Sequence, residues 1–220
     1  MAGVIIGWLD NGTVAGEFAS SVSKLVAYET YKERMFGILR VPWGPMLAEG
    51  RNHLVEKFLE TEADWLLMVD SDMVFPHTSI ETLLFDAVDH DAQVAGGLCF
   101  GANLEFGQFP TLYRNIDDRP HVWFDYPRDQ VIEVDATGSA FTLTHRSAYE
   151  DHRYSNEWPW FHRRHVFGTK EKPDAYLGED ISWCWWLREK GAKIVVDTGL
   201  KIGHIKQTTM NEDSYDRLRP

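Results

Sequence analysis

The sequence predicts an α/β fold: one domain with a Rossmann-like, mostly parallel central sheet flanked by helices, and a smaller mixed sheet beside it. Apolar runs of strand length alternate with stretches of helical period over the first seventy residues, as in βαβ units. The run at 65–69 is apolar throughout, which indicates a parallel strand buried on both faces. A chain of 220 residues suffices for one well-buried domain and is short for two.

Helical period and turn residues place the elements of the first part of the chain. Phe18, Val22 and Leu25 recur at helical spacing, and Thr13 precedes them as the expected N-cap. Arg51 and Asn52 lie in the first half of a second helical stretch. The expected elements are, in order, a strand at 3–9, a helix at 14–28, a strand at 34–41, a helix at 46–61 and a strand at 65–69.

The later part of the chain is less regular. Residues 101–129 mix Gly, Pro and Asn with aromatic residues, which favours short strands and loops on the substrate side. Pro76 suits the first turn of the helix that follows the apolar run at 65–69. The expected elements are a helix at 76–90, a strand at 93–100, a strand at 131–145 interrupted by Gly138, an irregular segment at 151–176, a helix at 178–189, a strand at 193–197 and a polar tail at 207–220.

Composition and charge narrow the class of protein. Hydrophobic residues make up 44% of the chain, as in a globular domain. The formal net charge of −12 disfavours binding of duplex nucleic acid without excluding it. Cys99 and Cys184 lie in apolar stretches without metal-site spacing, so we expect buried thiols in a reducing compartment. Because the chain has no basic, apolar leader and no apolar run of about eighteen residues, we expect a soluble, cytoplasmic protein without a membrane span.

Asp70 and Asp72 end the apolar run at 65–69 and are the first candidate site. In an open α/β sheet, ligands bind beyond the carboxyl ends of the strands, where these two carboxylates are expected to emerge. Carboxylate oxygens suit a divalent cation that completes its shell with water and phosphate oxygens. The alternative is a simple turn that caps the next helix.

Three further motifs have both a functional and a structural interpretation. Gly138 either lets a ligand approach the backbone or marks an ordinary bulge. Glu179 and Asp180 begin a helix, where acidic residues also favour the helix dipole. The long segment at 151–176 is typical of a lid or binding loop, or of a loop that covers the core with its Trp residues. Its aromatic and basic residues suit stacking on a sugar ring or on a base.

The order of these motifs resembles that of the GT-A glycosyltransferases, most closely the family 2-like enzymes of bacteria and their phages. The resemblance covers nearly the whole chain and rests on separated signatures that appear in the family's order. These signatures are the strand ending at Trp8-Leu9-Asp10, Arg51-Asn52, Val69-Asp70-Ser71-Asp72, Thr137-Gly138-Ser139, Gly178-Glu179-Asp180 and His204.

The resemblance implies a single GT-A domain over 1–220, with a nucleotide-sugar-binding half at 1–100, an acceptor and catalytic half at 101–205 and a tail at 206–220. The implied reaction moves a sugar from a nucleotide-diphospho sugar, a UDP-sugar being favoured, to an acceptor hydroxyl. The implied metal ligands are Asp72, His204 and Asp70, and the metal is Mn²⁺ (or Mg²⁺), because imidazole suits manganese better than magnesium. The implied donor-binding residues are Trp8, Asp10, Arg51, Asn52, Asp70, Ser71 and Gly138.

On the acceptor side, the resemblance implies that Glu179 and Asp180 are the catalytic acids. In an inverting enzyme Asp180 is the general base, and in a retaining enzyme this role disappears. The expected acceptor-binding residues are Trp158, Trp160, His162 and His165. The acceptor is left open between a glycan, a protein, a small molecule and a hydroxymethylated base of phage DNA.

Two other functions compete with glycosyl transfer. A sugar-phosphate nucleotidyltransferase shares the Rossmann-like half, but such enzymes open with a basic, glycine-rich loop, and residues 3–13 contain no Lys or Arg. A non-catalytic nucleotide-sugar or glycan-binding protein of the same fold is opposed only by the intact set of acids and histidine.

Overall fold

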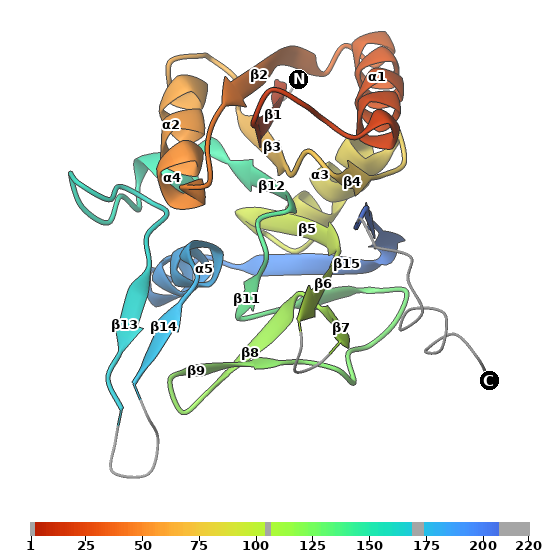
Figure 1. Cartoon of the computed structure of the whole chain (residues 1–220). Helices are drawn as coiled ribbons and strands as arrows, with labels where there is room; N and C mark the ends of the chain where they lie inside the picture. Colours follow the sequence, from red (N-terminus) through yellow and green to blue (C-terminus); the bar gives the residue numbers. More distant parts are fainter. Residues whose placement is uncertain (1–2, 104–106, 169–173, 207–220) are drawn as a thin grey trace, which may run out of the picture.

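The computed structural model describes residues 3–103, 107–168 and 174–206, and its centre is a seven-stranded sheet (Figure 1). The strand order is β10-β15-β5-β12-β3-β1-β2. The strands are β1 (Val4–Asp10), β2 (Met35–Pro42), β3 (Trp65–Val69), β5 (Val94–Leu98), β10 (Val131–Glu133), β12 (Phe141–His145) and β15 (Ile194–Lys201).

The sheet is mostly parallel, as the sequence predicted. β1 is parallel to β2 and β3, and β15 is parallel to β5. β12 is antiparallel to both β3 and β5, so it separates two groups of strands that run in the same direction. The edge strand β10 is antiparallel to β15. The carboxyl ends of five strands therefore meet at one edge of the sheet, where ligands bind in folds of this kind.

Helices cover both faces of the sheet. The helices are α1 (Gly16–Tyr31), α2 (Leu47–Leu59), α3 (Ser79–Asp89), α4 (Arg146–Glu150) and α5 (Glu179–Glu189). Apolar residues of α1 and α3 share one buried cluster with Leu67 and Val69, while those of α2, α4 and α5 share the other with Leu66 and Met68. Because successive side chains of β3 point to opposite faces, both clusters need apolar residues, which explains its unbroken apolar run.

Smaller strand pairs lie beside the central sheet (Figure 1). The predicted smaller sheet is three-stranded, in the order β11-β8-β9, and its pairs are antiparallel rather than mixed. β4 pairs with β16, β6 with β7, and β13 with β14, the last as a hairpin that extends away from the sheet. The strands are β4 (Met73–Val74), β6 (Phe100–Asn103), β7 (Gly107–Pro110), β8 (Leu112–Ile116), β9 (Arg119–Val122), β11 (Ala136–Thr137), β13 (Arg164–Val166), β14 (Ala175–Leu177) and β16 (Gly203–His204).

Two helix starts differ from the sequence-based expectation. The N-cap of α1 is Ala15, which makes no side-chain capping bond, because the Thr13 hydroxyl donates to Asn11 Oδ1 at 3.0 Å instead. α3 begins at Ser79 rather than in the turn at Pro76, whose carbonyl oxygen accepts hydrogen bonds from the Ser79 amide and hydroxyl. In both places a local hydrogen bond of a side chain or a turn forms where the sequence predicted the start of the helix.

Two strand predictions are also corrected. The single strand expected at 131–145 is three strands, because the chain leaves the central sheet after β10, pairs with β8 as β11 and returns as β12. The pattern of apolar residues along a strand does not show which neighbouring strand it pairs with. The segment expected to be irregular at 151–176 contains β13 and the start of β14. The predicted tail at 207–220 lies outside the described residues.

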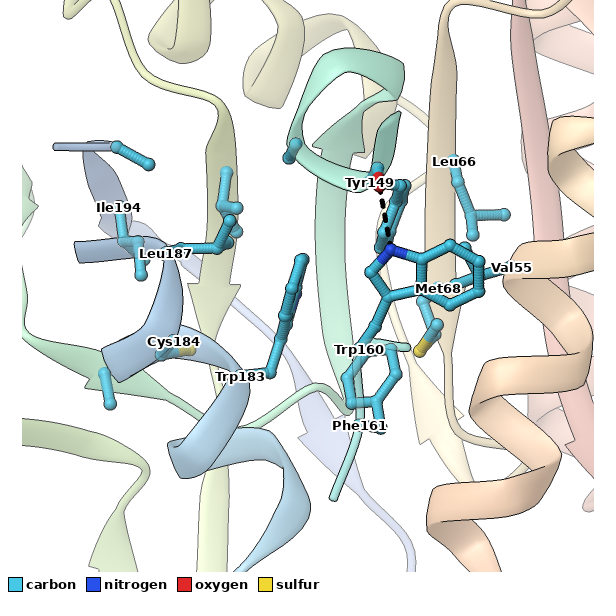
Figure 2. Close-up of a cluster of buried hydrophobic side chains, with 14 of the residues drawn as sticks. Val55, Leu66, Met68, Tyr149, Trp160, Phe161, Trp183, Cys184, Leu187 and Ile194 are labelled. Carbon is cyan, nitrogen blue, oxygen red and sulfur yellow. Dashed lines mark hydrogen bonds between the residues drawn. The ribbon is translucent and has the colours of Figure 1, made fainter. Parts of the chain in front are cut away.

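The core explains several of the nine tryptophans (Figure 2). Trp183 stacks on Tyr149 with ring centroids 5.6 Å apart, and Trp160 meets Tyr149 edge-on at 5.9 Å. The Trp160 indole nitrogen donates to the Tyr149 carbonyl oxygen at 2.8 Å. Trp160 is only 2% exposed, so its expected contact with an acceptor is corrected to a core contact.

Both cysteines are free and buried, as expected, and burial raises the pKa of Cys184 to about 12. None of the helices in the described part of the chain is long and apolar enough to cross a membrane.

Candidate functional site

Asp70 and Asp72 lie in a tight turn at the carboxyl end of β3. The Asp70 amide donates to the Ala140 carbonyl oxygen at 2.9 Å, and the Asp70 carbonyl oxygen accepts from the Met73 amide at 3.2 Å. Both carboxylates are partly exposed. Ser71, between them, accepts a bond from the Ala15 amide at its carbonyl oxygen, which joins the turn to the start of α1. The turn does not cap the next helix, whose N-cap is Thr78, and it leaves both acids open to solvent, so the metal-binding interpretation stays a prediction.

The pairing of β4 with β16 brings His204 to Asp72. The His204 Nε2 lies 3.1 Å from Asp72 Oδ2, and its Nδ1 lies 2.9 Å from the Phe100 carbonyl oxygen. A carbonyl oxygen can only accept, so Nδ1 carries a hydrogen, and the Nε2 of the neutral ring presents a lone pair to a carboxylate. Two acceptors face each other unless a second proton or a cation lies between them.

This arrangement fits a divalent cation. Metal-ligating histidines typically donate their second ring N–H to a carbonyl or carboxylate, as Nδ1 does here. Among the described residues no group of three or more His, Cys, Asp or Glu side chains converges on one point, because Asp70 turns to Arg51 instead. Asp72 and His204 could supply two ligands, which would suit an ion that takes its other ligands from water and phosphate. Lys206 Nζ also donates to Asp72, at 3.3 Å, and would compete with such an ion.

Arg51 bonds to two acids at this edge of the sheet and lies near a third, Asp180. It projects from α2, is 4% exposed, and donates to Glu179 Oε1 at 2.6 Å and to Asp70 Oδ1 at 3.3 Å. Burial lowers the pKa of Arg51, but Asp70, Asp180 and Glu179 raise it, and the net shift is upward. The guanidinium therefore stays charged and ties the start of α5 to the end of β3.

Asp180 faces Gly138 at the centre of the site. Its Oδ1 accepts from the Ile181 amide at 2.8 Å, and its Oδ2 lies 3.6 Å from where a Cβ at position 138 would be. Burial raises the pKa of Asp180, nearby Arg51 lowers it and Glu179 raises it, with an upward net shift. A Cβ at Gly178 would lie 2.9 Å from Asp180 Oδ1, so the glycine leaves room for this carboxylate.

The acid at the end of β1 is already fully bonded. Asp10 accepts two bonds from Arg40, at 2.7 and 2.8 Å, and further bonds from the Gly12 amide and the Trp8 indole nitrogen. The Arg40 bond lowers the pKa of Asp10 to about 2 despite burial. Its expected direct contact with the donor is corrected: Asp10 orients Arg40 and Trp8, and the Arg40 side chain is 49% exposed. Sequence analysis missed Arg40, although its polar position in a strand was a usable signal.

Two more predicted site residues make contacts within the protein. Asn52 donates to the Phe161 carbonyl oxygen and accepts from the Phe161 amide, both at 2.8 Å, and so anchors the segment at 158–163. His165 lies in β13, 3.2 Å from Asp174, and lines a different cavity from Trp158. The donor contact expected of Asn52 and the acceptor contact expected of His165 stay predictions. The roles of Ser71 and Gly138 stay predictions.

Trp158 and His162 line a cavity of about 590 Å³ that also contacts Glu179. Met46 and Leu47, at the start of α2, also line it. The structure thus brings two of the four predicted acceptor residues to the same cavity as Glu179 at the start of α5.

Solved structures share the fold of this chain at low sequence identity. A protein named A197 from STIV is 16% identical with a TM-score of 0.61, and the match covers 93% of this chain and 86% of that one. GalNAc-T7, crystallised with UDP, GalNAc and Mn²⁺, is 10% identical with a TM-score of 0.60, and 94% of this chain matches 44% of its length. This chain therefore spans less than half of the GalNAc-T7 chain. No protein-family model matches the sequence, and no curated protein is similar to it. The likenesses confirm a GT-A-like fold.

Proposed function

We propose that this protein is a metal-dependent glycosyltransferase that moves a sugar from a nucleotide-diphospho sugar, favoured as a UDP-sugar, to an acceptor hydroxyl. The observation that carries the proposal is the pair formed by Asp72 Oδ2 and His204 Nε2, 3.1 Å apart at the carboxyl edge of the sheet. The bound UDP and Mn²⁺ of GalNAc-T7 support the same chemistry on a similar fold. The assignment to the family 2-like enzymes of bacteria and phages stays a prediction.

In the proposed reaction, the acceptor oxygen forms a bond to the anomeric carbon as the bond from that carbon to the diphosphate oxygen breaks. The electron pair leaves with the diphosphate. Asp72 and His204 would hold the cation, with Asp70 nearby, and the bound cation would neutralise the charge that develops on the diphosphate. Arg51 holds the position of Asp70 through its hydrogen bond.

Asp180 suits the role of general base in an inverting reaction. Its Oδ2 faces Gly138, whereas Glu179 is held by Arg51 at 2.6 Å. An upward-shifted pKa brings the carboxylate closer to the value at which it takes a proton efficiently near neutral pH. The proton of the acceptor hydroxyl would pass to Asp180 as the new bond forms.

The test is the thermal shift caused by UDP with and without Mn²⁺, in the wild-type protein and in Asp72→Asn. A ligand that binds only the folded state raises Tm, so UDP with Mn²⁺ should raise it more than either alone. Asp72→Asn should abolish the Mn²⁺-dependent part and leave the fold intact, since it changes a partly exposed carboxylate and no core packing.

Asp91→Asn is the matched control, because Asp91 is 99% exposed beyond the end of α3. It should retain the full Mn²⁺-dependent shift. If the Asp72→Asn protein binds UDP with unchanged Mn²⁺ dependence, the assignment of Asp72 as a metal ligand is wrong.

A further inference from the structure

Lys206 also contacts the carboxylate that is proposed to hold the metal. Its Nζ donates to Asp72 Oδ2 at 3.3 Å, and the same oxygen lies 3.1 Å from His204 Nε2. The backbone fixes where this side chain begins, because the Ile205 amide donates to the Asp72 carbonyl oxygen at 2.8 Å. The oxygen that the metal would use therefore already pairs with a cation of the chain itself.

The ion pair between Lys206 and Asp72 is weak enough to be exchanged. The two side chains are 55% and 38% exposed, and water screens an ion pair of that exposure. A lysine ammonium is a compact charge on a flexible stem, and Lys206 also lines a cavity of about 220 Å³ that leaves room for its side chain to move. A divalent cation at Asp72 Oδ2 would repel the ammonium, so the two cannot share that oxygen.

Two other cations described at this edge of the sheet are held more firmly. Arg51 is 4% exposed and bonds to two carboxylates, and Arg40 makes two hydrogen bonds to the buried Asp10. Lys206, by contrast, has a single hydrogen bond to one exposed carboxylate among the described residues. A phosphate group carries strong acceptor oxygens and a negative charge, and it binds lysine as a point charge. Lys206 is therefore the cation that a phosphate near Asp72 would attract.

We propose that Lys206 is an exchangeable counter-ion of the metal site, which pairs with Asp72 in the free protein and with a phosphate oxygen of the donor in the complex. When Mn²⁺ binds alone, the ion pair of Lys206 is lost and nothing replaces it. When Mn²⁺ binds together with the nucleotide diphosphate, the ammonium gains a new anionic partner. Lys206 thus opposes binding of the metal alone and favours binding of the metal with its nucleotide. This inference rests on the proposed function and adds to it a control on when the metal binds.

The test is Lys206→Met, which keeps a long side chain and removes its charge. Mn²⁺ alone is titrated against the full chain and followed by the paramagnetic resonance signal of free Mn²⁺. Loss of the competing ammonium should strengthen this binding about threefold to tenfold. UDP is titrated by calorimetry at saturating Mn²⁺, and loss of a partly exposed hydrogen bond between charged groups should weaken it about tenfold. One substitution should therefore move the two affinities in opposite directions.

Two variants and one ligand serve as controls. Lys201→Met removes the same charge at the end of β15, from a side chain that is 67% exposed and pairs with Asp129, and it should change neither affinity. Lys206→Arg keeps the charge and should return both affinities toward the wild-type values. Uridine, which carries no phosphate, should bind the wild-type protein and Lys206→Met equally. The Lys206 side chain is more than half exposed, so Lys206→Met should fold with an unchanged Tm in the absence of ligands.

Shifts of the two affinities in the same direction, or no shift in either, would overturn the inference. Tighter binding of Mn²⁺ alone with unchanged binding of UDP would make Lys206 a competitor only and overturn its transfer to the phosphate. Weaker binding of UDP with unchanged binding of Mn²⁺ alone would overturn its role at Asp72. If Mn²⁺ does not strengthen UDP binding to the wild-type protein, the proposed function is refuted, and this inference with it. If Mn²⁺ strengthens that binding but Lys206→Met leaves both affinities unchanged, only the inference is refuted.

Discussion

Replacing Arg51 by glutamine should reveal how strongly one buried cation holds the candidate site together. Arg51 is 4% exposed and donates to both Glu179 and Asp70, and Asp180 lies within its electrostatic reach. Arg51→Gln keeps a polar side chain of similar reach but removes the charge. The three carboxylates then lose their common counter-charge and repel one another.

The magnitude follows from the burial of the pair. Removing one partner of a buried ion pair costs about 3–5 kcal/mol, because it leaves the other charge uncompensated. The Glu179 and Asp70 side chains are 18% and 38% exposed, so water replaces part of the lost interaction. We therefore expect a loss near the lower limit, about 3 kcal/mol, which for a chain of this size lowers Tm by roughly 6–12 °C.

The loss should depend on pH in a defined direction. Arg51 lowers the pKa of Asp180 against the upward effect of burial, so its removal raises that pKa further. An acid whose pKa is higher in the folded state than in the unfolded state destabilises the fold as pH rises above the unfolded value, about 4. The deficit of Arg51→Gln should therefore be largest near pH 7.5 and shrink toward pH 4.5.

Urea denaturation at pH 4.5 and pH 7.5 measures both quantities, with Arg40→Gln as the matched control. Arg40 pairs with Asp10, whose pKa shifts in the opposite direction from that of Asp180, because the Arg40 bond lowers the pKa of Asp10 to about 2. The stability from that lowered pKa is present above about 4 and is lost only as pH falls toward 2, so the Arg40→Gln deficit should be nearly constant over this interval. A deficit below about 1 kcal/mol for Arg51→Gln at pH 7.5, or an equal deficit at both pH values, would refute this reasoning.

Three further predictions concern the chemistry of the site. Asp180→Asn should cut turnover by about 10²–10⁴-fold with donor affinity unchanged, and near-normal transfer would exclude this base and leave Glu179 or a retaining mechanism. His204→Ala should raise the Mn²⁺ concentration needed for UDP binding with little loss of stability; an unfolded variant whose folded fraction binds metal normally would make the histidine structural. Gly138→Ala should preserve Tm, since its Cβ would make only ordinary contacts, but reduce turnover on the order of tenfold or more. Gly16→Ala, with open space around the added methyl, should leave both unchanged.

The strands of the central sheet and the edge that carries the candidate site were predictable from sequence. An apolar run such as 65–69 reports burial on both faces, and the position of Asp70 and Asp72 at its end follows from chain direction alone. The strand expected at 131–145 contained β12. Its antiparallel position between β3 and β5 was not predicted, because the pattern of apolar residues along a strand does not show which strands it pairs with.

The errors at the site share one physical cause: a residue type suited to binding is equally suited to internal bonding. Trp160 looked like a contact for an acceptor, and its indole nitrogen is bonded inside the protein. The same holds for Asp10, whose partner Arg40 becomes a neighbour only through the register that pairs β1 with β2. Spacing along the chain cannot reveal such pairs, which are distant in sequence.

Arg51 and Asn52 occupy successive positions of α2 but bond to different segments of the protein. Arg51 bonds to the acids at the end of β3 and the start of α5, and Asn52 bonds to the backbone of Phe161. Because successive residues of a helix differ by about 100° in direction, one turn of α2 fixes both attachments. Displacement of the segment at 158–163 would therefore break both hydrogen bonds between Asn52 and Phe161. Helix α2 therefore sets the spacing between the two halves of the site. If the segment at 158–163 is replaced by another sequence, specificity should be transferred only when the residue that bonds to Asn52 keeps its position in the segment.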